Sequence, residues 1–245
     1  MIKIFFNTIL FLLFYQQAIS GTNSYILGST ATVGTTCPAG TYDFAWNGDY
    51  PSDTDKACTN SGAASQDGTM SGGTLSSSYG YSGVGLRVTA NNQYLTWSYV
   101  LDNSLGTVWM WVYFADETPA STTPFFESSY NTSNRLYLQA LTNGRLQATY
   151  QGAGTPTQSS SSTGDTLANG WNRVAMAWDQ VNGHLTWKIG AGSWYGVTGG
   201  SLTAWAGATN DTTIGENELA AVFTETVYID DLYYVNSYQA ADPMP

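Results

Sequence analysis

The last third of the chain alternates apolar and polar residues with a period of two. In segment 171–179, Val174, Met176 and Trp178 share one side of an extended chain, and segment 184–190 alternates in the same way. Successive side chains of a β-strand point to opposite faces, so this pattern is typical of half-buried strands. The pattern therefore predicts that both segments are strands with one face in a core.

Short turn signals separate the alternating segments. Asn182-Gly183 lies between the two segments just described, and Asn143-Gly144 lies between segments 135–141 and 145–151. Asn and Gly both tolerate a positive φ, which tight hairpin turns require. We therefore expect two β-hairpins at these places.

The composition favours an all-β protein. Charged residues make up 10% of the chain and aromatic residues 14%, and Gly, Ser and Thr are abundant, so good helix formers are few. Alternating segments recur about every ten residues, with turn signals between them, which is typical of a sandwich. We expect an all-β fold, a two-sheet antiparallel β-sandwich.

Three motifs resemble one family. Segment 171–179 has the form W-x-x-V-A-x-x-W-D, Ile214-Gly215 follows in a loop, and segment 229–236 has the form I-D-D-L-Y-Y-V-N. In this order they resemble the laminin-G-like, concanavalin A-like lectin–glucanase jelly rolls. The resemblance covers about residues 40–238 and implies a concanavalin A-like jelly roll.

The chain divides into four expected parts. Residues 1–20 combine the positive charge of Lys3, a short apolar core and a small-x-small cleavage site, which indicates a secretory signal peptide. We expect an N-terminal extension at 21–40, the jelly-roll domain at 41–238 and a C-terminal tail at 239–245. The protein is therefore expected to be secreted or displayed at the cell surface.

Charge and cysteines agree with an extracellular setting. The net charge of −11 argues against nucleic acid and anionic membranes as partners. Two cysteines in a secreted chain, Cys37 and Cys58, predict one disulfide worth about 3 kcal/mol. The sequons at Asn131 and Asn210 would carry glycans if the source glycosylates its proteins.

A ligand site is expected on an outward-facing sheet surface. In segment 107–115 the aliphatic positions suit the core, which leaves the Trp and Tyr side chains outside. Outward side chains of the hairpin at 135–151 add Tyr, Arg and Gln, and we expect both sets to line one concave sheet that touches glycan. Aromatic rings stack on the apolar faces of sugars, and Arg and Gln pair with hydroxyls. The candidates are Trp109, Trp111, Tyr113, Arg135, Tyr137 and Arg145, with Gln139 and Gln147 as lesser ones.

Two alternatives stay open for the aromatic positions. Loops could cover the tryptophans, which would then only pack against the sheet. Trp194-Tyr195-Gly196, in a Gly-rich segment, is either an exposed binding edge or a lid that folds back.

The resemblance also implies a structural calcium ion. In the family, an acid of the closing strand often helps hold Ca²⁺, and the match here is Asp230, with Asp43 or Asp49 as a partner. The alternative is that Asp230 accepts backbone N–H hydrogen bonds. The acidic loop Glu216-Asn217-Glu218 is a weaker calcium candidate.

Patterns that indicate catalysis are missing. The glucanase relatives use three carboxylates on one strand, and Glu216-x-Glu218 lacks the third acid. His184 is the only histidine, and no nucleophile elbow is present, so a Ser-His-Asp triad is not indicated. We expect no enzymatic activity.

The leading hypothesis is a non-catalytic carbohydrate-binding or adhesion module, with a glycan or glycoprotein as its partner. A structural subunit of an extracellular coat or filament is the first alternative, because low charge density with many Ser, Thr and Gly residues suits self-association. A glycoside hydrolase or polysaccharide lyase is the second, since distant strands could bring catalytic groups together.

Overall fold

The computed structural model describes residues 37–38, 40–50, 54–60, 64–160, 164–205, 211–215 and 225–243. The chain from Gly34 onward forms one compact unit. The expected leader 1–20, the sequon at Asn210 and the acidic loop at 216–218 lie outside the described residues.

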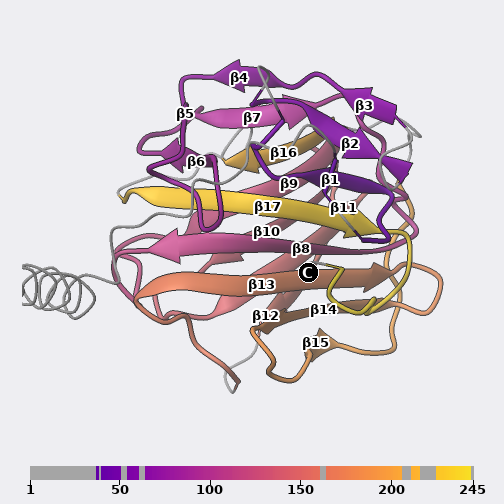
Figure 1. Cartoon of the computed structure of the whole chain (residues 1–245). Coiled ribbons are helices and arrows are strands. Elements are labelled where there is room, and N and C mark those ends of the chain that lie inside the picture. Colours follow the sequence, from indigo (N-terminus) through magenta and orange to yellow (C-terminus); the bar gives the residue numbers. More distant parts are fainter. Residues whose placement is uncertain are drawn as a thin grey trace, which may run out of the picture. The chain divides into compact units, whose positions relative to one another are not determined.

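The described residues form two antiparallel sheets (Figure 1). Sheet A has the order β15-β14-β13-β8-β17-β1-β2-β3, and β6 joins it beside β17 and carries β5. Sheet B has the order β12-β11-β10-β9-β16-β7-β4. The strands of sheet A are β1 (Phe44–Trp46), β2 (Ala57–Thr59), β3 (Ala64–Gln66), β5 (Thr74–Ser76), β6 (Gly85–Val88), β8 (Leu105–Phe114), β13 (Gly170–Asp179), β14 (His184–Ile189), β15 (Tyr195–Val197) and β17 (Val227–Val235). The strands of sheet B are β4 (Thr69–Ser71), β7 (Tyr94–Trp97), β9 (Thr123–Asn131), β10 (Asn134–Ala140), β11 (Leu146–Gly152), β12 (Thr155–Ser160) and β16 (Asp211–Gly215).

The core lies between the inner faces of the two sheets, as the alternation predicts. On β8 the aliphatic positions, such as Val108, Met110 and Val112, are fully buried in this core. On β13 the same holds for Met176 and Trp178. The largest core side chains include Trp46, Trp97, Phe114, Phe126, Trp178, Trp187 and Tyr234. The all-β sandwich prediction is confirmed.

Both predicted hairpins form, with longer loops than a two-residue turn. β13 and β14 are paired up to Asp179 opposite His184, so four residues connect them. Of the Asn182-Gly183 pair only Gly183 has a positive φ, of 67°. The Asn182 side chain donates to Asp179 Oδ2 at 2.6 Å. The second loop is closed by Leu141 N–H donating to the Arg145 carbonyl at 2.7 Å.

β17 changes its neighbour halfway along its length. Its first half pairs with β6, with Ile229 opposite Leu86, and its second half pairs with β1, with Leu232 opposite Trp46. The register along β8 also shifts between Asp230 and Tyr233. Two acidic residues, Asp230 and Asp231, therefore lie where sheet A forks between β6 and β1 (Figure 1).

The predicted disulfide between Cys37 and Cys58 is present, with 5.7 Å between the Cα atoms. It fastens the segment before β1 to β2. Within the described part of the chain, no helix has the length and apolar character that a membrane crossing needs.

Candidate functional site

A row of aromatic side chains crosses the outer face of sheet A. Trp171 of β13 lies opposite Tyr113 of β8, which lies opposite Tyr228 of β17. The ring centroids are 5.6 Å apart for the first pair and 5.2 Å apart for the second. Arg87 of β6 continues the same row beyond Tyr228.

The loop between β5 and β6 adds two tyrosines to this row. Tyr79 stacks on Tyr228 with 5.3 Å between centroids, and Tyr81 stacks on Trp111 at 3.8 Å. The Tyr81 side chain is 50% exposed. We call this set of partly exposed rings the aromatic row; its members are Tyr79, Tyr81, Trp111, Tyr113, Trp171 and Tyr228.

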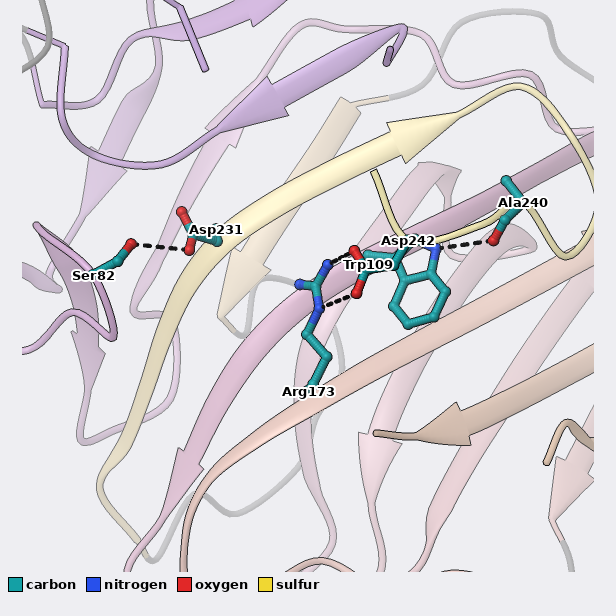
Figure 2. Close-up of polar contacts among 6 residues, drawn as sticks. All are labelled: Ser82, Trp109, Arg173, Asp231, Ala240 and Asp242. Atoms are coloured by element: carbon teal, nitrogen blue, oxygen red, sulfur yellow. Dashed lines mark hydrogen bonds and ion pairs between the residues drawn. The ribbon is translucent and has the colours of Figure 1, made fainter. Parts of the chain in front are cut away.

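Buried carboxylates hold this tyrosine loop against the fork in sheet A. Asp230 Oδ2 accepts hydrogen bonds from the backbone N–H groups of Tyr81 and Ser82, at 2.7 and 3.1 Å. Ser82 Oγ donates to Asp231 Oδ2 at 3.1 Å (Figure 2). Asp49, which follows β1, accepts from Val84 N–H at 3.0 Å. These contacts bind the loop to β17 and to the end of β1.

The acids at the fork lie in an environment that disfavours their charge. Burial raises the pKa of Asp231 to about 6, although the Ser82 hydroxyl and the Arg173 charge oppose the shift. Burial, together with the charge of Asp231, raises the pKa of Asp230 well above its usual range. Burial also raises the pKa of Asp49.

The acids at the fork have hydrogen-bond partners within the protein. Asp230 uses its oxygens for three backbone N–H donors, the third being Asp231 N–H at 2.8 Å. Among the residues described, no group of three or more His, Cys, Asp or Glu side chains is placed to hold a metal ion. Asp43 is also engaged, because it accepts from Asn236 N–H at 2.7 Å. Calcium binding by Asp230 and Asp49 stays a prediction.

Trp109 lies on the same outer face but is covered. Its side chain is 4% exposed, and its Nε1–H donates to the Ala240 carbonyl at 3.3 Å (Figure 2). Trp194 packs edge-on against it with 6.0 Å between centroids, whereas Tyr195 and Gly196 belong to β15, the strand that pairs with β14 in sheet A. The segment is therefore an edge strand rather than a lid, and only Trp194 lies over Trp109. The alternative that other segments cover the tryptophans therefore holds for Trp109, whereas Trp111 stays partly exposed.

The other predicted ligand residues lie on the opposite side of the molecule. Arg135 and Tyr137 are on β10 and Arg145 directly precedes β11, both strands of sheet B. The two sets of candidates face away from each other, so the expectation that they line one sheet is wrong. The reason is that the chain crosses from sheet A to sheet B between β8 and β9, which alternation within a strand does not reveal.

The sheet B candidates are largely engaged with one another. Tyr137 is 7% exposed, and the Arg135 guanidinium lies 5.4 Å from its ring centroid. Arg135 Nε donates to Gln151 at 2.9 Å, and Gln139 Nε2 donates to Gln147 at 2.6 Å. Arg135, Gln139 and Gln147 thus have side-chain partners on this surface, whereas the buried Nε of Arg145 has no hydrogen-bond partner among the described residues.

Two remaining candidates have ordinary surroundings. The His184 ring lies 5.1 Å from the Tyr238 ring and is partly buried. Asn131 ends β9 and is exposed, and its Oδ1 accepts from Ser133 N–H at 2.9 Å. Its glycosylation stays a prediction.

Sequence reasoning missed several residues of the sheet A face. Trp171 and Tyr228 were recognisable, since each alternates against core positions in its own strand. Tyr79 and Tyr81 lie in a loop, and no local pattern indicates where a loop folds. Arg173 also alternates against the core positions of its strand, but no local pattern indicates that Asp242 is its partner.

Comparisons with known proteins agree with the fold. No family model matches the sequence, and no curated protein matches it either. Trypanosoma rangeli sialidase in complex with sialic acid is similar in structure, with a TM-score of 0.54 and 12% identity over 80% of this chain and 31% of that one. The botulinum neurotoxin type G receptor-binding domain has a TM-score of 0.56 and 11% identity over 82% of this chain and 49% of that one. The chain thus spans less than half of either protein, and at these identities the likeness concerns the fold alone.

Proposed function

We propose that the protein is a secreted or cell-surface module that binds carbohydrate without catalysis, through the outer face of sheet A. The observation that carries this proposal is the aromatic row, six rings in mutual contact on one sheet face. Flat apolar rings with polar edges suit the C–H faces and hydroxyls of pyranose rings. The outward Arg87 at one end supplies hydrogen-bond donors.

The rings are preorganised for a ligand. Tyr81 is fixed from both sides, because its ring stacks on Trp111 and its backbone N–H donates to the buried Asp230. A surface that is already ordered loses little conformational entropy when a ligand binds. The similar fold of a sialidase in complex with sialic acid supports a carbohydrate context, and the disulfide supports an oxidising, extracellular one.

A glycan array on the purified protein tests this proposal. Tyr81→Ala removes a ring that is 50% exposed on sheet A, and Tyr130→Ala removes one that is 46% exposed on sheet B, so the two variants are matched. We expect Tyr81→Ala to weaken glycan binding about fivefold to tenfold, the equivalent of a lost ring contact of about 1 kcal/mol. Tyr130→Ala is expected to bind like the wild-type protein.

Other results would redirect the assignment. An equal loss of glycan binding in both variants would show that the outer face of sheet A is not the specific binding surface. No binding to any glycan, together with ordered assemblies in electron micrographs, would favour the structural-subunit alternative. Release of new reducing ends from a bound glycan would favour the hydrolase or lyase alternative.

A further inference from the structure

A cavity of about 450 Å³ lies beside the aromatic row on the outer face of sheet A. Its walls include the rings of Trp109 and Trp194 and the charged groups of Arg173 and Lys188. The segment that follows β17 closes another side and brings Asp242 to the cavity. Two cations and two tryptophans thus line one pocket that is open to solvent.

Arg173 is a buried cation whose partner is a carboxylate. It is 8% exposed, and its guanidinium carbon lies 5.2 Å from the Trp109 ring and 5.6 Å from the Trp111 ring. Arg173 Nε donates to Asp242 Oδ2 at 2.8 Å, and Nη2 pairs with Oδ1 of the same carboxylate (Figure 2). This two-point contact is the geometry with which arginine selects carboxylates in general. Nη1 is buried and has no hydrogen-bond partner among the residues that the structure describes.

Lys188 is a second cation in the same cavity. Its ammonium nitrogen lies 5.4 Å from the ring centroids of both Trp109 and Trp194. Within the described part of the chain it forms no ion pair. The described residues that line this cavity include two cations and one carboxylate. The lining is thus net positive, although the whole protein has a net charge of −11.

Asp242 reaches the cavity from an exposed segment. Its side chain is 37% exposed, and it lies 69 positions away from Arg173 in the sequence. The segment is anchored nearby, because Ala240 N–H donates to Thr107 Oγ1 at 3.0 Å and its carbonyl accepts from Trp109. The anchor at Ala240 is thus separate from the contact between Asp242 and Arg173.

We propose that this cavity binds the carboxylate of an acidic sugar and that Asp242 competes with that ligand for Arg173. The ligand carboxylate takes the two-point contact with Arg173, Lys188 supplies the second charge contact, and the more exposed Trp194 ring contacts the sugar ring. The sugar class rests on the carbohydrate binding proposed above, whereas the carboxylate preference rests on the two cations.

Calorimetric titration of the whole protein with defined probes tests this inference. The probes are trigalacturonic acid and sialyllactose as acidic saccharides, lactose as the neutral one and tetraglutamate as an acidic peptide. We expect Asp242→Asn to bind the acidic saccharides about threefold to tenfold more tightly than the wild-type protein, because an internal competitor is removed. Glu117→Gln, which removes one negative charge from the exposed loop after β8, is expected to leave the affinity unchanged.

A second variant addresses the cavity directly. Lys188→Met keeps the length of a partly buried side chain and removes its charge, and it is expected to weaken binding of the acidic saccharides at least fivefold. Circular dichroism and the melting temperature of each variant establish that the fold is kept. Arg173 itself is left in place, since its burial makes a folding defect hard to separate from a binding defect.

Three results would overturn the inference. They are the absence of acidic-saccharide binding by Asp242→Asn, an unchanged affinity in that variant, and binding of tetraglutamate as tight as that of the saccharides. The protein could also bind neutral glycans in a way that depends on Tyr81 and fail to bind acidic saccharides. That result would contradict ligand binding in this cavity and support the function proposed above.

Discussion

Asp231 is a buried carboxyl with its backbone at a φ of 53°, beside the fully buried Asp230. Its pKa of about 6 in the folded protein lies above the ordinary value of 3.8. Between these two values the folded state binds more protons than the unfolded state, so the free energy of unfolding falls as pH rises. The stabilising effect of the proton is complete below about pH 4 and lost above about pH 6.

Asp231→Asn is therefore expected to stabilise the protein at neutral pH. The amide cannot ionise, tolerates a positive φ and can still accept the Ser82 hydroxyl. We expect the free energy of unfolding to rise by about 1–3 kcal/mol at pH 7.5 and to match the wild type near pH 4. Urea unfolding at both pH values checks this. A variant that is less stable at pH 7.5 would show that the ionised Asp231 carboxylate stabilises the folded protein, which would contradict the effect expected from its burial.

The hairpin of β13 and β14 shows how one element depends on a single position. Gly183 has a φ of 67°, and a Cβ atom there would lie 2.3 Å from the Gly200 carbonyl oxygen. Gly183→Ala is expected to lower the free energy of unfolding by about 2–4 kcal/mol, through the left-handed backbone and the clash together. Gly190 is a control that has the left-handed backbone without the clash, because its φ is 58° and nothing lies within 4 Å of the position that a Cβ atom would take. Gly190→Ala is expected to cost only about 1–2 kcal/mol; equal losses in thermal unfolding would contradict the role of the clash.

The strands and the face that each side chain takes were predictable from the sequence, but the neighbouring strands in each sheet were not. Alternation correctly predicted that Val108 and Met110 face the core and that Trp109 and Trp111 face outward. It could not predict that β10 belongs to the other sheet, because a period of two reports the face of a strand and not its sheet. The fork at Asp230 was equally hidden, since it depends on β17 meeting β6 and β1 in turn.

Contacts between distant segments were the least predictable part of the site. Arg173 and Asp242 are 69 positions apart, and Tyr81 and Asp230 are 149 apart. Each contact depends on where a loop comes to lie, which residue types alone do not determine. The aromatic composition indicated the kind of ligand surface, and the folded loops determine which rings form it.

At the scale of the whole molecule, the Cys37–Cys58 disulfide restrains the segment before β1. The two cysteines are 21 positions apart, and Cys58 lies in β2 toward the edge of sheet A. Replacing both by serine is expected to lower the free energy of unfolding by about 3 kcal/mol, mainly because the unfolded chain gains freedom. Chemical unfolding of the variant, and of the wild type with and without reductant, measures the loss. An unchanged stability would mean that β1 and β2 stay paired without the covalent link.

The basic residues are few and unevenly placed. The chain has 7 Lys and Arg residues against 18 Asp and Glu, yet Arg87, Arg173 and Lys188 all belong to the outer side of sheet A. Such an arrangement makes one side of an acidic molecule locally attractive to anions. A negatively charged polymer in solution would be steered to meet this side first, so its association rate would decline as ionic strength increases.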